Sequence, residues 1–213
     1  MNTLTRKQRE RHQRQTAILD VAERLFHRIG YDKTTIEDIA HEAEFAKGTI
    51  YLYFSSKEDI ISGLIDRGLE QLVSKFQKIN QTEATGLEAY RQMGDTFVSF
   101  FQKHPSYPKI FALFHSIDAQ SVAPEIFEHK KTLVEEMARA IARGIDDGSI
   151  RSNVEPAKTA LLTAMTAASF VHQQIKHVPP AYEVCTVSPS ELLEYLFSLL
   201  SQAIEAKASG QKK

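Results

Sequence analysis

The residues best suited to chemistry lie at 34–57, in the run TTIEDIAHEAEFAKGTIYLYFSSK. Within it, 47–54 carries a lysine, a threonine and two tyrosines that a helix would expose, while Ile50 and Phe54 are spaced to anchor the other face. Ammonium, hydroxyl and phenol groups on an exposed helix can bond phosphates and base edges in a DNA groove, and Gly48 would allow close approach. The spacing indicates either the recognition helix of a helix-turn-helix or a small buried helix whose tyrosines only pack.

The elements that must position this segment are helices. Apolar residues recur at helical spacing along nearly the whole chain, and no segment shows sustained strand alternation. A first helix is predicted over about 8–29, with Gly30 as its stop. Its buried stripe is expected to contain Ile18, Val21, Ala22, Leu25, Phe26 and Ile29, and the next helix would bury Ile36, Ile39, Ala40 and Ala43.

Polar residues mark where the next helices begin. Thr34 or Thr35 can cap the second helix, with Glu37 or Asp38 completing a capping box. Ser56 can cap a fourth helix that runs to about residue 79. A helix of that length would join two domains rigidly.

The rest of the chain also favours helices. Pro105 and Pro108 would divide an aromatic-rich stretch at 88–118 into two helices. Further helices are predicted over about 123–147, 156–177 and 190–206, with a disordered tail at 207–213. The predicted fold is all-α.

Charge is distributed unevenly along the chain. The net charge is −1, but residues 1–57 carry 10 Lys/Arg against 8 Asp/Glu, which gives +2, and the remainder carries 16 against 19, which gives −3. The first fifteen residues include five basic residues and one acidic residue, Arg6, Lys7, Arg9, Arg11 and Arg14 against Glu10. This segment is either an arm that follows DNA phosphates or a solvated, frayed terminus.

Several classes of protein find little support. Cys185 is the single cysteine, so no internal disulfide is expected, and with no apolar signal segment after the start we expect a cytoplasmic protein. The uncharged run at 159–175 is short and polar for a membrane span. No HExxH, P-loop, Rossmann or nucleophile-elbow motif is present, and Glu125, Glu128 and His129 lack the Glu-x-x-His spacing of di-iron bundles. We therefore expect no enzyme, no metal ion and no cofactor.

The order and spacing of these motifs resemble the tetracycline-repressor (TetR) family of bacterial transcription regulators. The resemblance covers roughly residues 12–62 and rests on Ala22-x-x-Leu25-Phe26-x-x-x-Gly30-Tyr31, Thr35-Ile36-x-x-Ile39-Ala40, Ala46-Lys47-Gly48-Thr49-Ile50-Tyr51-x-Tyr53-Phe54 and Ser56-Lys57-Glu58-Asp59-Ile60. Two positions depart from the family pattern. Glu44 stands where the turn usually has glycine, and Ala46 replaces the usual Ser or Thr cap.

The resemblance implies a DNA-binding domain at 1–60 and a helical effector-binding and dimerisation domain at 61–206. In the first, Thr35 and the start of the second helix would hold phosphate, the third helix would lie in the major groove, and Tyr53 and Lys57 would grip flanking phosphates. The implied DNA-binding set is Thr34, Thr35, Lys47, Gly48, Thr49, Tyr51, Leu52, Tyr53 and Lys57.

The last two helices carry a broader apolar arc than one core requires, which favours a dimer interface over a helix pair buried within one chain. The predicted interface residues are Leu161, Ala164, Met165, Ala168, Val171, Leu192, Leu196, Leu199, Leu200 and Ala203.

An apolar effector pocket is the further expectation. It would be lined by Met93, Phe97, Phe100, Phe101, Phe111, Phe114, Phe127 and Met137, with His115 or His172 as a polar contact, and the alternative is that these aromatics are plain core.

The predicted function is that of a homodimeric repressor released from palindromic double-stranded DNA when a small, mostly apolar effector binds. The alternatives are an activator, a nucleoid-associated DNA binder without effector, a membrane-surface or scaffold protein, and a helical-bundle enzyme.

Overall fold

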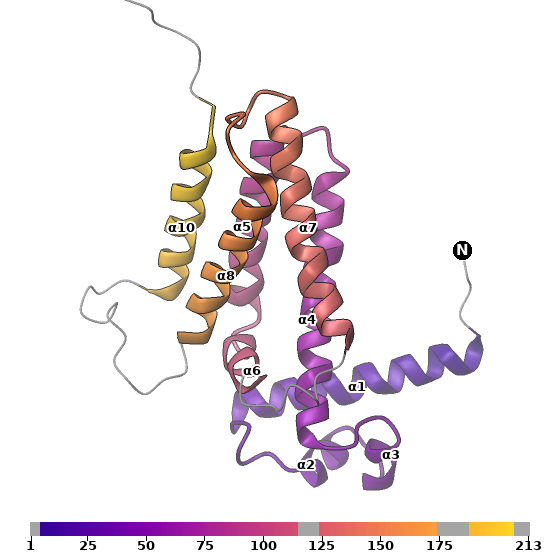
Figure 1. The fold of residues 1–213 in the computed structure, drawn as a ribbon. Coiled ribbons are helices and arrows are strands. Elements are labelled where there is room, and N and C mark those ends of the chain that lie inside the picture. Colours follow the sequence, from indigo (N-terminus) through magenta and orange to yellow (C-terminus); the bar gives the residue numbers. More distant parts are fainter. Residues whose placement is uncertain (1–4, 115–123, 174–187, 207–213) are drawn as a thin grey trace, which may run out of the picture.

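The computed structural model describes residues 5–114, 124–173 and 188–206, and these ranges contain helices and no strand. The helices are α1 Arg6–Arg28, α2 Ile36–Glu42, α3 Lys47–Tyr51, α4 Lys57–Asn80, α5 Gly86–Lys103, α6 Tyr107–Phe114, α7 Pro124–Asp146, α8 Pro156–Gln173 and α10 Pro189–Ile204. The all-α prediction is confirmed. Figure 1 shows α1, α2 and α3 grouped at one end, from which α4 rises into an upright bundle with α5, α7, α8 and α10.

The ends of α1 and α2 follow from capping chemistry. Thr5 and Gln8 form a capping box that starts α1, so the basic segment predicted as an arm or a frayed end is helical from Arg6. Gly30 ends the helix with φ +87°, a left-handed conformation that glycine adopts at little cost. Thr35 and Asp38 form the capping box of α2, as predicted.

Three details of this region differ from the prediction. Ile29 is 41% exposed, because α1 ends at Arg28 and the helical period no longer directs the next side chain inward. Ala43, the C-cap of α2, is only partly buried. α3 is shorter than 47–54, since after Tyr51 the chain turns and the amides of Tyr53 and Phe54 both donate to the Ile50 carbonyl.

α4 connects the two ends of the molecule without interruption. Ser56 caps it as predicted, accepting a hydrogen bond from the Asp59 amide. Its first half packs into the same core as α1 and α2 through Ile60, Ile61, Leu64 and Ile65, all fully buried. Its second half packs mainly against α5 and α7. A displacement of one half is therefore transmitted to the other through continuous helical hydrogen bonds.

The bundle is closed by short-range ties at its far end. The Asn80 amide donates to the side chain of buried Glu136 on α7, which fastens the end of α4. The Arg151 amide donates to the Ile204 carbonyl and the Ala206 amide to the Ser149 carbonyl, which holds the end of α10 against the α7–α8 turn. The last predicted residues of the 156–177 helix and the predicted tail at 207–213 lie outside the described residues.

Candidate functional site

The turn between α2 and α3 is tight and strained at one residue. Glu44 has φ +57°, the left-handed region in which glycine is usual, and among the described residues no other non-glycine has a positive φ. The Phe45 amide donates to the Ala40 carbonyl at 2.9 Å, which holds the turn closed. A side chain in this conformation costs about 1 kcal/mol. The turn geometry of a helix-turn-helix is thus retained although the glycine is absent.

The outer face of α3 is open. Ile50 and Phe54 are buried and anchor the segment, as predicted. Tyr51 and Leu52 are 48% and 75% exposed, although aromatic and aliphatic side chains of this size normally pack away from water. No other atom would come within 4 Å of a Cβ placed on Gly48, so the backbone there is free to approach a partner surface. Ala46 starts the helix without a side-chain cap.

One charged pair sits on this face. Lys47 of α3 donates to the carboxylate of Glu37 on α2, and both side chains are at least half exposed. The hydrogen bond from Lys47 lowers the pKa of Glu37 and raises the pKa of Lys47. In the free protein the two charges offset each other, so a phosphate must compete with Glu37 for the Lys47 ammonium.

Two residues predicted to contact DNA are occupied inside the protein. Thr34 is buried, and its hydroxyl donates to the Gly30 carbonyl at 2.7 Å, because the loop folds its side chain inward. The Lys57 ammonium donates to the carbonyls of Tyr31 and Thr34 at 2.8 and 2.9 Å and lies 4.1 Å from the centre of the Tyr31 ring. Lys57 therefore fastens the α1–α2 loop to α4, and Thr34 does not face outward. Sequence spacing could not show these contacts.

Basic residues on α1 extend the same face. Arg6, Lys7, Arg9, Arg11 and Arg14 are all exposed on the first turns of α1, which project beyond α3 in Figure 1. The Arg11 guanidinium lies 5.9 Å from the ring centre of Tyr53, directly after α3. Arg11 was absent from the predicted site, although the charge count in residues 1–15 was the signal that could have included it. Together these residues form a basic flank beside α3.

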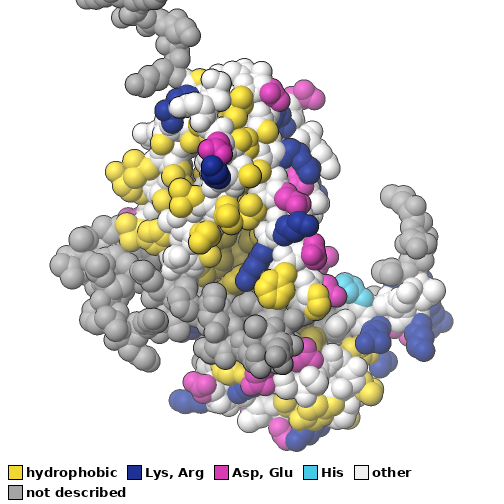
Figure 2. Space-filling view, in the orientation of Figure 1, with side chains coloured by type: hydrophobic (Ala, Val, Ile, Leu, Met, Phe, Trp, Pro, Cys, Tyr) yellow, Lys and Arg dark blue, Asp and Glu magenta, His cyan; other side chains and the backbone are white. Residues whose placement is uncertain are grey.

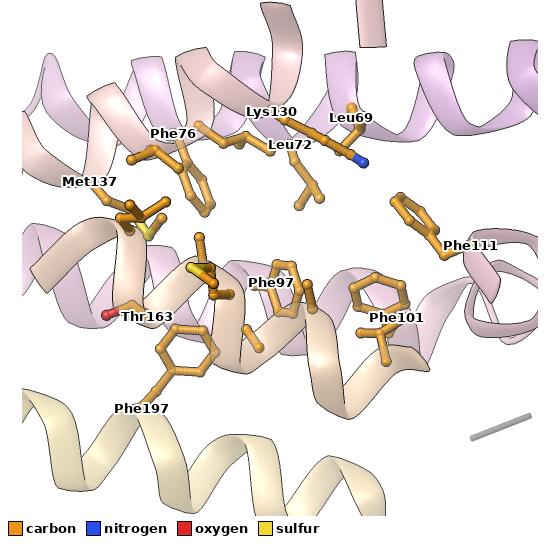
Figure 3. Close-up of a pocket in the computed structure, with 18 residues that line it drawn as sticks. Leu69, Leu72, Phe76, Phe97, Phe101, Phe111, Lys130, Met137, Thr163 and Phe197 are labelled. Atoms are coloured by element: carbon orange, nitrogen blue, oxygen red, sulfur yellow. The ribbon is translucent and has the colours of Figure 1, made fainter. Parts of the chain in front are cut away.

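A cavity of about 300 Å³ lies within the helical bundle between α4, α5, α7 and α8 (Figure 3). Its walls are almost entirely apolar. The lining residues are Leu69, Leu72, Phe76, Phe97, Phe101, Phe111, Lys130, Leu133, Val134, Met137, Leu161, Thr163, Ala164, Met165, Ala167, Ala168, Val171 and Phe197. A cavity of this size and character can hold a small apolar molecule.

The predicted pocket residues divide between wall and core. Phe97, Phe101, Phe111 and Met137 line the cavity. Met93 and Phe100 are instead buried in the packing between helices, and Phe127 is 53% exposed because it lies on the outer face of α7. The side chains of Phe114, His115 and His172 lie outside the described residues.

The α8 wall was missed as a wall, because Leu161, Ala164, Met165, Ala168 and Val171 were expected at a dimer interface. Lys130 was also missed, since nothing in the spacing of α7 separates it from its exposed neighbours.

An exposed apolar surface covers α8 and α10. Leu161, Leu162 and Met165 on α8 and Tyr195 and Leu199 on α10 are each 45–63% exposed. Figure 2 shows hydrophobic side chains gathered on this side of the bundle. Of the remaining predicted interface residues, Ala168 and Ala203 are exposed, Ala164, Leu192, Leu196 and Leu200 are partly buried, and Val171 is buried in the core. We call the five large residues the α8–α10 apolar face.

A polar cluster joins α1 to the bundle. Arg67 of α4 donates to Asp20 and Glu23 of α1 at 2.5 and 2.7 Å. The other Glu23 oxygen accepts from the Ser106 hydroxyl at 3.1 Å and lies 3.5 Å from His104 Nδ1, both just before α6. Since α6 also carries the cavity residue Phe111, this cluster connects the cavity wall to α1 by a second route beside α4.

A helix-turn-helix with an exposed second helix, carried on a helical bundle that encloses an apolar cavity, defines a DNA-binding transcription regulator. Residues 18–64 match the family model described as "Bacterial regulatory proteins, tetR family". The chain belongs to the TetR family of transcription regulators.

Relatives of similar length support this assignment. The chain is 28% identical over 157 residues to the uncharacterized HTH-type transcriptional regulator YfiR of Bacillus subtilis, covering 68% of this chain and 72% of that protein. It is 27% identical over 146 residues to the HTH-type transcriptional repressor KstR2 of Rhodococcus jostii, covering 67% and 70%.

Among solved structures, a TetR/AcrR-family regulator from Thermobifida fusca shares the fold with a TM-score of 0.69, 23% identity and coverage of 94% of this chain and 100% of that one. Bacillus subtilis FadR in complex with stearoyl-CoA does so with a TM-score of 0.68, 20% identity and coverage of 89% and 99%. In the described part of the chain, no helix is long and apolar enough to cross a membrane, and no three His, Cys, Asp or Glu side chains gather as metal ligands would.

Proposed function

We propose that this regulator is a homodimeric repressor that leaves a palindromic operator when a small, mostly apolar molecule enters the bundle cavity. The observation that carries the proposal is the course of α4. Ile60, Ile61 and Leu64 of this helix complete the core beneath the helix-turn-helix, and Leu72 and Phe76 of the same helix form part of the cavity wall. One rigid element thus belongs both to the DNA-reading end and to the cavity.

DNA reading is assigned to α3 and its flanks. Tyr51 and Leu52 are exposed, Gly48 is open, and Lys47 and Thr49 lie beside them. We infer that these side chains meet base edges and nearby phosphates in the major groove, as in other helix-turn-helix proteins.

Phosphate contacts are assigned around this helix. Thr35 at the start of α2 and Tyr53 would lie against the backbone, and the basic flank of α1 would follow the DNA beyond them. Lys57 is left out, because its ammonium is held by two carbonyls.

A two-fold operator follows from a two-fold protein. The α8–α10 apolar face presents five large exposed hydrophobic side chains on adjacent helices, and a second copy of the chain would cover it. Two recognition helices fixed by such a dimer read two half-sites, which makes the operator palindromic.

An apolar effector is supported by the cavity walls, and the similar FadR structure is a complex with stearoyl-CoA. A ligand releases the DNA only if it binds the non-reading arrangement more tightly than the reading one. In this protein, outward pressure on Leu72, Phe76 or Phe111 would move α4 and α6 relative to α1, and so change the separation of the two recognition helices.

Selection of bound fragments from a random DNA pool tests the proposal. A palindromic consensus bound by a dimer is the expected result, and an apolar compound that binds the cavity should weaken that complex. Recovery of DNA without a consensus, or of a single half-site, would contradict the homodimeric operator-binding role.

A further inference from the structure

The cavity has one charged lining residue among the described side chains, Lys130 of α7. The chain is partly buried there, and burial lowers the pKa of its ammonium group. Figure 3 shows the Lys130 nitrogen directed toward the end of the cavity marked by Leu69 and Phe111. A cation in so apolar a wall is costly to keep solvated by protein alone, and an anion placed beside it is favoured over a neutral group.

The other polar lining group is at the opposite end and is already engaged. The Thr163 hydroxyl donates to the Thr159 carbonyl at 2.8 Å and lies 2.8 Å from the Tyr90 hydroxyl. Figure 3 places Thr163 near Met137, away from the Lys130 nitrogen. Between these ends the wall is made of Leu72, Phe76, Phe97 and other apolar side chains. The cavity is therefore polar at one end and apolar along the rest of its length.

Resting on the effector-binding role proposed above, we propose that the ligand is a monoanionic amphiphile, a carboxylate carried on an unbranched apolar body. The carboxylate lies against Lys130, and the body extends along the Phe97 side of the cavity toward Met137. The cavity volume of about 300 Å³ is at the small end of ligand pockets, so it suits a medium-length chain and leaves no room for a nucleotide. A coenzyme thioester lacks the carboxylate charge at this position, which separates the two sources of an acyl chain.

Direct titration of the full-length protein with three ten-carbon probes, decanoate, decanol and decyltrimethylammonium, tests the headgroup. Wild-type protein should bind decanoate at least tenfold more tightly than decanol, and the cationic probe most weakly. Lys130→Met keeps a chain of similar length without the charge, so it should remove the preference for decanoate, while Lys130→Arg should restore it. Lys131→Met is the matched control, because Lys131 lies one residue away on the same helix, is 64% exposed and does not line the cavity.

Equal binding of the three probes to wild-type protein, or an unchanged preference in Lys130→Met, would overturn the inference. Binding of decanoyl-coenzyme A that exceeds decanoate binding and ignores Lys130→Met would also overturn it. DNA binding is measured separately on the selected operator. Lys130-dependent decanoate binding that leaves the operator complex intact would support the ligand class and contradict the release mechanism.

Discussion

The Nη2 atom of Arg67 on α4 donates to Glu23 Oε2 on α1 at 2.7 Å, and Arg67 Nη1 reaches Asp20 at 2.5 Å. Only 17% of the Arg67 side chain and 20% of the Glu23 side chain are exposed. Sheltered charges that are fully paired fix geometry more than they add stability, but removing one partner leaves the others uncompensated. This contact therefore sets how α1 is seated against the bundle.

Arg67→Met should lower the free energy of unfolding by about 1–3 kcal/mol, because Asp20 and Glu23 then face each other without the guanidinium. Urea unfolding at neutral pH measures the change. Lys158→Met is the control, since the Lys158–Glu155 pair is exposed and should contribute less than about 0.5 kcal/mol. A loss in Arg67→Met no larger than in the control would show that the cluster does not hold α1.

Glu37→Gln should strengthen DNA binding. The substitution removes a carboxylate from the α3 face and frees the Lys47 ammonium for a phosphate. The slope of log affinity against log salt concentration should steepen by about 0.9 for one added phosphate contact. Fluorescence anisotropy over a salt series measures both quantities.

Glu83→Gln is the matched control for this charge change, because Glu83 is exposed in the α4–α5 turn, far along the chain from α3. An identical slope in wild type and Glu37→Gln would mean that Lys47 makes no phosphate contact.

Lys57→Met should destabilise the protein by about 1–3 kcal/mol, because two carbonyls of the α1–α2 loop lose a charged donor. The salt slope of DNA binding should stay unchanged, since Lys57 is already engaged within the protein. Unfolding by urea and anisotropy on the same preparations separate the two effects. A slope reduced by about 0.9 with unchanged stability would return Lys57 to the phosphate-binding set.

Asp38→Asn should weaken the protein at neutral pH and much less in acid. Hydrogen bonds from the Thr35 hydroxyl and amide lower the pKa of Asp38. The folded pKa lies below the unfolded one, so this contribution is complete above about pH 4 and is lost as the pH falls through the folded pKa. Urea unfolding between pH 7 and pH 3 should show the wild-type advantage shrinking.

Asp32→Asn serves as the control for this pH series, because Asp32 is an exposed aspartate of the preceding loop that caps no helix. A difference between wild type and Asp38→Asn that stays constant with pH would exclude the charge of the capping box as its cause.

Much of the helical framework could be read from local signals. Gly30, Thr35 and Ser56 mark helix ends through rules that involve only a few neighbouring residues, and all three are confirmed. The buried positions of α1 follow its period up to the point where the helix ends, which is why Ile29 alone was misplaced.

The side-chain assignments that failed depend on contacts far apart in the sequence. Lys57 bonds to carbonyls 23 and 26 residues away, and no local pattern encodes that choice. Whether Phe97 or Phe100 faces the cavity depends on where α8 and α6 pack against α5. The same packing turns Val171 inward although it lies on a helix with an exposed apolar face.

The reading of DNA by α3 is tested most directly by anisotropy of Tyr51→Ala on the selected operator and on a scrambled duplex of equal length and charge. Tyr51 is half exposed and anchors no core, so the variant should fold normally. We predict at least tenfold weaker binding to the operator and little change on the scrambled duplex. Equal affinity of wild type and Tyr51→Ala for the operator, or an equal loss on both duplexes, would contradict the assignment of α3 as the recognition helix.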